Sequence, residues 1–343
     1  MLYRLFGHTV TSDFPFVNRM TPGDGDPDLI ISCVDQPPPT LNWEETSPVY
    51  PSHVLTEGGD PTVCLYHLAK CDVLSFPRIA DFYIWPDHII CHRSDPRCRN
   101  EIEIYLLGTV LSLWLEKRGI PALHAAAVAV DGGAIAFLSS NGGGKSSLAA
   151  AFMQVGYALL TDDILPVEQR DNVFSACPGY PQMRFWPNEA MYFIGHYEDL
   201  ELVHPSFSKR RIPIGPENFG AFCSAPLPLA CLYLPERLDT ESGCSDIKIS
   251  QVSPRDATIE LIRHSFDAMV LDALGLHGQR LDLLARMARR VPLRRITYPS
   301  GFQHLPAARN AILDDLQMLR RQQTKRKCEF PNICPKQASQ IID

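Results

Sequence analysis

The sequence lacks an apolar run long enough to cross a membrane. The nearest candidate, residues 104–115 (IYLLGTVLSLWL), is shorter than the roughly 18 apolar residues that a spanning helix needs, and charged residues flank it on both sides. The first residues (MLYRLFGHTVTSDF) contain no apolar segment of the secretory type. These absences predict a soluble, cytoplasmic protein without a membrane partner.

The sequence also lacks a positive net charge and internal repeats. Its 32 Lys and Arg against 39 Asp and Glu give a formal net charge of −7 over 343 residues. This charge argues against a general nucleic-acid-binding surface and leaves only a local basic patch open, so we expect no nucleic-acid partner. No period of 20–50 residues is visible, which excludes solenoids and propellers.

Cysteine is unusually frequent, but no Cys-x-x-Cys pair occurs. The 11 cysteines are odd in number and the chain is long, whereas secreted disulfide frameworks are short and evenly paired. We therefore expect most of them to be small buried hydrophobic side chains. Cys91, His92 and Cys98 lack the partner that a zinc site needs, and Cys328 and Cys334 are expected to be exposed thiols.

The composition predicts two domains and a tail. Short apolar runs between turn residues indicate a small β-rich N-terminal domain over 1–98. A helix predicted over 100–118, ending before Gly119, begins a second domain over 99–321. The polar, basic residues 322–343 predict a flexible tail.

The centre of the chain shows the layout of a nucleotide-binding site. Two apolar runs, 124–130 and 134–138, flank a turn of Asp-Gly type and predict a hairpin. A glycine-rich stretch, a helix over 145–155 and a strand over 157–160 follow, and an acidic pair comes next. Later segments predict a loop over 178–187, a strand over 229–234, and helices over 254–274, 281–290 and 306–321.

Residues 139–146 (SSNGGGKS) match the second half of the Walker A pattern, with Ser139 where the first glycine belongs. Glycines let backbone N–H groups turn inward around phosphate oxygens. Lys145 can reach the β- and γ-phosphates, and the Ser146 hydroxyl can bind Mg²⁺. We therefore predict an ATP and Mg²⁺ site; the alternative is a glycine-rich turn before a helix. The residues predicted to bind the nucleotide are Ser140, Asn141, Gly142, Gly143, Gly144, Lys145, Ser146 and Ser147.

Asp162 and Asp163 follow a predicted strand directly. Two adjacent carboxylates can divide the work of a kinase, because one can support a metal while the other orients or deprotonates the acceptor hydroxyl. The alternative is a solvated turn in which one aspartate caps the backbone.

Three elements in register resemble the catalytic domain of HPr kinase/phosphorylase, and more closely the related serine kinases of lasso-peptide biosynthesis. His124 lies on the strand before the hairpin, fifteen residues before the loop start at Ser139. Lys145 lies eighteen residues before Asp163. The resemblance is strong over about residues 100–170 and looser through 178–187 and 226–234.

The resemblance implies an α/β fold, namely a P-loop domain of the HPr-kinase and phosphoenolpyruvate carboxykinase type. It implies that Lys145 holds the phosphates, Ser146 ligates Mg²⁺, Asp163 accepts the acceptor proton and Asp162 supports the metal. His124 would lie near the transferring phosphate; the alternative is a hydrogen-bonded core histidine. The implied activity is an ATP- and Mg²⁺-dependent serine kinase acting on a ribosomal precursor peptide, and a homo-oligomer is left open.

The chain departs from the bifunctional enzymes at their second signature. We find no acidic-basic-glycine stretch with a metal-binding glutamate; Glu189 lies in a plausible region but has no motif around it. This departure argues against a second metal ligand, against phosphorylase activity and against HPr as the substrate.

Basic residues after the acidic pair are candidates for substrate binding. Arg184 lies among prolines and aromatic residues, and Lys209, Arg210 and Arg211 form a cluster. Guanidinium groups bind phosphate or carboxylate oxygens in pairs, whereas the alternative for the cluster is a solvated loop. Two other functions remain open, namely a nucleotide-binding regulatory protein with a degenerate loop and a kinase of a different protein or a small-molecule hydroxyl.

Overall fold

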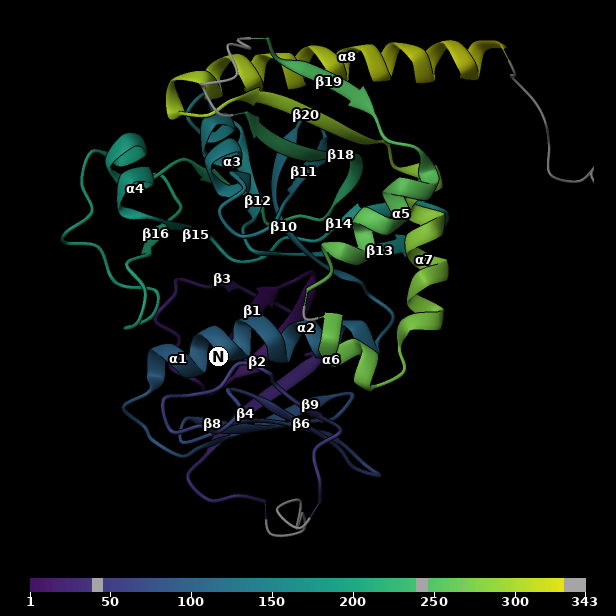
Figure 1. Ribbon diagram of the computed structural model, residues 1–343. Coiled ribbons are helices and arrows are strands. Elements are labelled where there is room, and N and C mark those ends of the chain that lie inside the picture. The colour runs from purple at the N-terminus through teal and green to yellow at the C-terminus, as the bar shows by residue number, and fades with distance from the viewer. Residues whose placement is uncertain (39–45, 239–245, 267, 330–343) are drawn as a thin grey trace, which may run out of the picture.

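The computed structural model describes residues 1–38, 46–238, 246–266 and 268–329 (Figure 1). Within these residues two nine-stranded sheets are combined with helices, and one two-stranded ribbon stands apart. The α/β class predicted from the sequence is confirmed at this level.

The first sheet is built by residues 2–93, where short apolar runs predicted strands. The strand order is β3-β1-β2-β4-β9-β8-β7-β6-β5. Neighbouring strands are antiparallel except in the pairs β2–β4 and β4–β9. The strands are β1 (Leu2–Leu5), β2 (His8–Ser12), β3 (Thr21–Pro22), β4 (Leu29–Val34), β5 (Tyr50–Pro51), β6 (Cys64–His67), β7 (Asp72–Phe76), β8 (Ala80–Ile84) and β9 (His88–Arg93).

A helical segment predicted over 100–118 follows the first sheet. It widens in the middle, where Gly108 has φ −95° and ψ −109°. It ends before Gly119, whose φ of +76° is the left-handed value that favours glycine. The helix is thus confirmed, with one interruption. Its parts are α1 (Arg99–Tyr105), the π-helical η2 (Leu106–Val110) and α2 (Leu111–Lys117).

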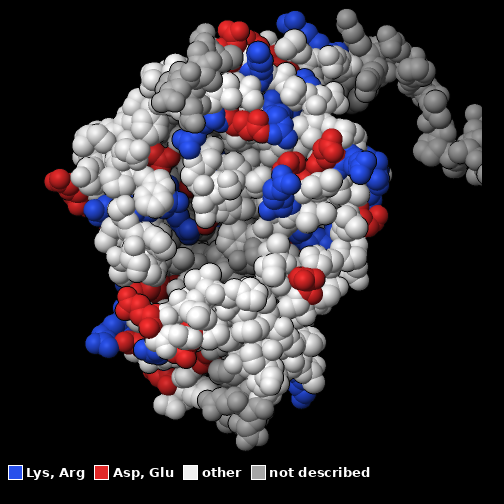
Figure 2. Space-filling model, viewed as in Figure 1, with Lys and Arg blue, Asp and Glu red and all other residues white. Residues whose placement is uncertain are grey.

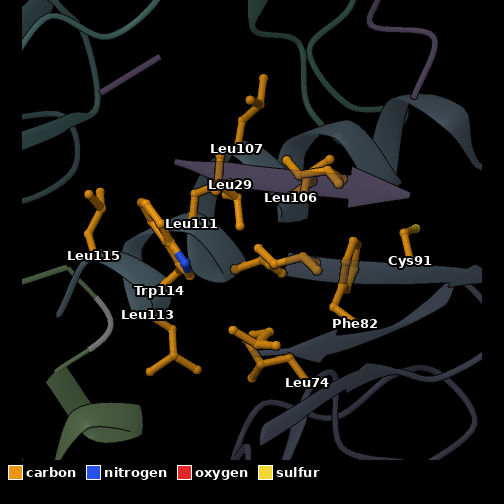
Figure 3. Packing of buried hydrophobic residues seen from close by; sticks show 14 of the residues in the cluster. Leu29, Leu74, Phe82, Cys91, Leu106, Leu107, Leu111, Leu113, Trp114 and Leu115 are labelled. Carbon is orange, nitrogen blue, oxygen red and sulfur yellow. The ribbon is translucent and has the colours of Figure 1, made fainter. Parts of the chain in front are cut away.

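This helical segment and the first sheet share one hydrophobic core. Figure 3 shows Leu106 and Trp114 of the helix on the side of the strands that carry Leu74 and Phe82. Each of these four side chains is at most 2% exposed. Burial of this kind contributes about 1.5–3 kcal/mol per large apolar side chain, so the helix is held on the sheet by packing.

The second sheet contains the predicted hairpin. Asp131 and Gly132, the turn between β10 and β11, have φ +48° and +79°, as a two-residue hairpin turn of type I′ requires. The strand order is β17-β12-β10-β13-β14-β18-β20-β19, and β11 pairs with both β10 and β18. The strands are β10 (Ala122–Val130), β11 (Gly133–Leu138), β12 (Ala158–Thr161), β13 (Ile164–Arg170), β14 (Val173–Ala176), β17 (Ala221–Phe222), β18 (Leu227–Leu238), β19 (Lys248–Gln251) and β20 (Leu293–Pro299).

Helices cover both faces of the second sheet (Figure 1). Successive strand residues point to opposite faces, so Ala126 and Val128 of β10 join the core under α3 and α8. Ala125 and Ala127 join the core under α5 and α7. The sheet is therefore the middle layer of three. The covering helices are α3 (Lys145–Met153), α8 (Leu305–Glu329), α5 (Pro254–Arg263) and α7 (His277–Arg290).

The prediction of one helix over 254–274 is wrong. α5 ends at Arg263, and α6 (Ala268–Ala273) begins after a break. In the break the His124 N–H donates to the His264 carbonyl (2.7 Å), and the Phe266 N–H donates to the Ala122 carbonyl (2.9 Å). The chain leaves the helix because its backbone bonds to the edge of β10 instead.

Two further predictions need correction. The expected loop over 178–187 contains β15 (Gln182–Phe185), which pairs with β16 (Arg210–Pro213). The tail expected from residue 322 is helical as far as Glu329, because the polar residues after 321 are good helix formers. The rest of that tail, with Cys334, lies outside the described residues. Among the helices described, none is both long and apolar enough to cross a membrane.

Two buried ion pairs join the helix over 99–117 to the part of the chain around the second sheet. Glu103 accepts the backbone N–H of Asn18 at 2.9 Å, and Arg211 Nη1 lies 3.4 Å from its Oε2. Glu116 is bound by Arg280 through two hydrogen bonds of 2.8 and 2.9 Å. Both carboxylates are buried, so each depends on its arginine.

Candidate functional site

The glycine loop, residues 139–146, connects β11 to the first turn of α3, as its pattern requires. Gly142 and Gly144 have φ +76° and +93°, which side chains rarely permit. Gly143 is needed for another reason, because a Cβ there would lie 2.4 Å from Ser139 Oγ. The loop and the start of α3 line one cavity, so backbone N–H groups at a helix N-terminus can meet an anion.

Lys145 is buried and folds back over the loop. Its Nζ donates to the carbonyls of Ser139 (2.7 Å) and Ser140 (3.2 Å). Burial lowers its pKa to about 8, and the nearby Asp162 and Asp163 oppose that shift. A bound phosphate would stabilise the ammonium, so this lysine is suited to an anionic ligand.

The two serines after Lys145 face different walls of the cavity. Ser146 Oγ donates to Asp162 Oδ1 at 2.8 Å. Ser147 Oγ donates to Glu189 Oε1 at 2.5 Å, and Glu189 belongs to α4 (Pro187–Ile194). Successive helix residues differ by about 100° in direction, so the start of α3 touches the acidic pair on one side and α4 on the other.

The Asp162 carboxylate is hydrogen-bonded to the Ser146 hydroxyl. Its second carboxylate oxygen accepts the Arg184 backbone N–H at 3.0 Å. Burial raises its pKa and the charge of Asp163 adds to the rise. A hydroxyl and a carboxylate oxygen are ligands that Mg²⁺ accepts while it keeps water and phosphate oxygens. Among the described residues, no group of three or more His, Cys, Asp or Glu is arranged to hold a metal ion.

Asp163 is held in a different electrostatic state. Arg184 Nη1 lies 2.6 Å from its Oδ2, and His124 Nδ1 lies 3.7 Å from its Oδ1. Burial acts to raise the pKa of Asp163, but Arg184 and the other nearby cationic groups outweigh it and lower the pKa. Its φ of +84° is rare for a residue with a side chain and costs about 1–3 kcal/mol, strain that the surroundings must hold.

His124 lies beside Asp163, near the N-terminal end of β10. Burial lowers its pKa to about 4, so the imidazole is neutral at neutral pH. Its ring stacks near Phe266, with centroids 5.9 Å apart. The structure therefore places a neutral His124 next to the predicted proton acceptor, with its Nδ1 3.7 Å from Asp163 Oδ1.

Two of the predicted substrate residues line the same cavity. Arg184 faces Asp163 and also donates to the Tyr180 hydroxyl at 3.2 Å. Lys209 lies over the ring of Trp186, 5.2 Å from its centroid. Both bring a positively charged group to the cavity that the glycine loop lines.

The other two residues of the basic cluster, Arg210 and Arg211, do not line this cavity. They belong to a strand, so the interpretation of the whole cluster as a solvated loop is wrong. Arg210 and Arg211 are consecutive residues of β16, so they point to opposite sides. Arg210 donates to the Leu200 carbonyl at 2.9 Å, whereas Arg211 is 4% exposed and pairs with Glu103.

The cavity that contains the glycine loop has a volume of about 510 Å³. A second cavity of about 580 Å³ meets it at His124 and Asn141. Figure 2 shows this face hollowed between the regions of α4 and α5, with Lys and Arg side chains on the rim. The predicted loop, the acidic pair, His124, Arg184 and Lys209 thus lie together around one opening.

Several residues of the cavity were not predicted. Trp186, Arg237 and Phe302 line it, and Arg237 donates from Nη2 to the Gly142 carbonyl. Glu189 was noted without a motif; its Oε2 accepts the Trp186 N–H at 2.9 Å. A proline at the first helical position with glutamate two residues later is a helix-start signal and could have located α4. Nothing local marks Arg237 or Phe302.

No family model matches the chain, and no curated protein matches it. Among solved structures, the chain is similar to the Hpr(Ser) kinase/phosphatase from Coxiella burnetii at 16% sequence identity and a TM-score of 0.28, over 60% of this chain and 98% of that chain. A TM-score this low does not establish a shared fold, so the assignments below depend on the geometry of the site.

Proposed function

We propose that this chain is an ATP- and Mg²⁺-dependent kinase that transfers the γ-phosphate to a serine hydroxyl of a peptide or protein. One observation carries the proposal, namely that Lys145 and Ser146 of the glycine loop share one cavity with Asp162 and Asp163. Phosphoryl transfer needs a phosphate cradle, metal ligands and a carboxylate aimed at the acceptor, and these four residues supply all three.

The residues present fit a nucleotide with its metal. Two glycines with positive φ and one crowded against Ser139 make a loop that side chains would obstruct. Ser146 and Asp162 would hold Mg²⁺, which when bound neutralises charge on the phosphate oxygens. Lys145 would bind the β- and γ-phosphates, and Arg184 and Lys209 would add positive charge at the transferring end.

Asp163 would orient the acceptor hydroxyl and take its proton. Its low pKa keeps the carboxylate ionised at neutral pH. The acceptor oxygen forms a bond to the γ-phosphorus while the bond to the β,γ-bridging oxygen breaks, and the hydroxyl proton passes to Asp163. In such loose transition states positioning matters more than basicity. Arg184 Nη1, 2.6 Å from Oδ2, fixes the position of this carboxylate.

The acceptor would approach through the second cavity. That cavity reaches His124 and Asn141 without crossing the first turn of α3, and it carries both Glu260 and Arg263 on its walls. Its size and mixed charge suit a polar peptide segment. We propose a ribosomally made precursor peptide as the substrate, because residues 100–170 resemble the kinases of lasso-peptide biosynthesis.

The test is incubation of the full chain with γ-labelled ATP, MgCl₂ and precursor peptides encoded by neighbouring genes. Transfer to a peptide serine that is lost in Lys145→Ala and Asp163→Asn supports the proposal. Transfer that persists in both variants would overturn the site assignment. ATP binding without transfer to any acceptor would indicate a regulatory nucleotide-binding protein, and transfer to a metabolite would indicate a small-molecule kinase.

A further inference from the structure

An aromatic wall borders the glycine loop and has no part in the chemistry proposed above. Phe302, in the short helix η4 (Phe302–His304), and Asn188, in the first turn of α4, line the same cavity as Gly142–Ser147. Tyr192 of α4 stacks on Phe302 with ring centroids 4.8 Å apart. We infer that Phe302 is the platform on which the base of the bound nucleotide stacks; this inference rests on the proposed function.

The direction of the triphosphate places the base on this side. Ser146 bonds to Asp162, so the γ-phosphate end lies toward the acidic pair. Ser147 bonds to Glu189 of α4, on the other side of the first turn of α3. A nucleoside is attached to the α-phosphate, the end opposite the transferring group. It therefore lies toward α4 and η4.

Phe302 is held as a rigid platform. Tyr192 covers one ring face, Phe193 meets it at 69° with centroids 6.1 Å apart, and the Tyr192 hydroxyl donates to the Phe302 carbonyl at 3.2 Å. The preceding Gly301 has φ +113°, a value that a side chain would oppose. Phe302 is half-buried and lines the cavity, so the face turned away from Tyr192 can accept a flat ring. A rigid aromatic ring loses little freedom on binding.

The ligand class is a purine nucleotide. Stacking between a base and an aromatic side chain grows with the ring area in contact, and purines have two fused rings. Asn188, whose amide carries both a donor and an acceptor, stands on the same wall and can meet a base edge.

The experiment compares ligands with and without a base. Dissociation constants for ATP, UTP and inorganic tripolyphosphate would be measured by calorimetry in MgCl₂ on the full chain. The variants are Phe302→Ala, Phe302→Tyr and, as a control, Phe207→Ala, an exposed aromatic residue outside the cavity. We expect Phe302→Ala to weaken ATP binding about tenfold and tripolyphosphate binding less than twofold. Phe302→Tyr and Phe207→Ala should bind ATP like the natural chain, and UTP should bind more weakly than ATP.

Other results would contradict either the stacking role of Phe302 or the proposed function. Equal loss of ATP and tripolyphosphate in Phe302→Ala would mean that Phe302 only supports the loop, and the inference would fail. Equal binding of ATP and tripolyphosphate by the natural chain would also end it, while leaving the phosphate site intact. If the natural chain binds neither ligand, the proposed function fails with it. Circular dichroism of Phe302→Ala separates loss of the platform from loss of folding.

Discussion

Arg184 Nη1 lies 2.6 Å from Asp163 Oδ2, whereas Asp162, the adjacent residue, accepts only the backbone N–H of Arg184 and the hydroxyl of Ser146. The pKa values of these two neighbouring carboxyl groups are therefore shifted in opposite directions. The pKa of Asp163 is lowered because nearby cations outweigh its burial, and the pKa of Asp162 is raised by burial and by the charge of Asp163. The two adjacent carboxyl groups therefore lie in different electrostatic environments, and their proposed roles are assigned from their contacts: Asp162 with the Ser146 hydroxyl, and Asp163 with Arg184.

Substitution of each aspartate should separate these roles. We expect Asp163→Asn to lower kcat for phosphoryl transfer by about 10²–10⁴-fold with little change in the Kd for ATP. Asp162→Asn should instead raise the Mg²⁺ concentration needed for half-maximal rate. Initial rates over a Mg²⁺ titration measure both effects. If excess Mg²⁺ rescues Asp163→Asn but not Asp162→Asn, the two roles are reversed.

Nucleotide binding should weaken at alkaline pH. Burial lowers the pKa of Lys145 to about 8, so the side chain is charged below that pH and loses its proton as the pH rises through it. Only the ammonium attracts phosphate, so the Kd for ATP should rise about tenfold for each pH unit above 8. Calorimetry from pH 6.5 to 9.5 measures this, and it should also detect proton uptake on binding near pH 8. Lys145→Arg stays charged and should give a flat profile; the same rise in both proteins would rule out Lys145 as the cause.

A side chain introduced at residue 143 would be crowded by Ser139, and a second substitution at residue 139 should relieve that crowding. A Cβ at residue 143 would lie 2.4 Å from Ser139 Oγ and 3.1 Å from the Ser140 carbonyl oxygen. Gly143→Ala should therefore cost about 1–3 kcal/mol, seen as weaker ATP binding. Adding Ser139→Gly removes the closer contact and should restore part of the affinity, while Ser139→Gly alone should bind ATP at least as well as the natural chain. The binding constants of the three variants test this, and a double variant no better than Gly143→Ala would show that Ser139 is not the obstacle.

The consecutive arginines of β16 should differ in their effect on stability. Arg211 is buried beside Glu103, so Arg211→Met leaves a buried carboxylate with two backbone N–H groups but without its arginine. This change should lower the free energy of unfolding by about 3 kcal/mol. Arg210 bonds to the Leu200 carbonyl and lies over the Tyr197 ring, so Arg210→Met should cost about 1 kcal/mol. Urea unfolding of both variants gives the comparison. Equal losses would contradict the assignment of the buried pair.

The sequence located the parts of the site that are continuous along the chain. The hairpin turn at Asp131, the loop glycines and the carboxylates after β12 follow from local rules on turns, positive φ and strand ends. The roles of these residues in catalysis stay predictions. Their positions around one cavity are what the fold adds.

Other parts of the fold and the site could not be predicted from the sequence, because they depend on contacts between segments that are distant along the chain. The strand that carries Arg184 exists because it pairs with residues 210–213, and a four-residue strand leaves almost no periodic signal. The break after α5 arises from backbone bonds to β10, where tertiary contacts override a helical pattern. Phe302 reaches the glycine loop only because η4 packs on Tyr192.

The helix over 99–117 has a consequence for how this molecule can be divided. Its Glu103 neutralises Arg211 on the strand beside that of Arg184, and its Glu116 neutralises Arg280, which also binds Ser265 next to the segment that touches His124. A chain without this helix would leave the buried guanidinium groups of Arg211 and Arg280 without a carboxylate partner. The part of the chain that carries the glycine loop should therefore be less stable when it is expressed without residues 99–117.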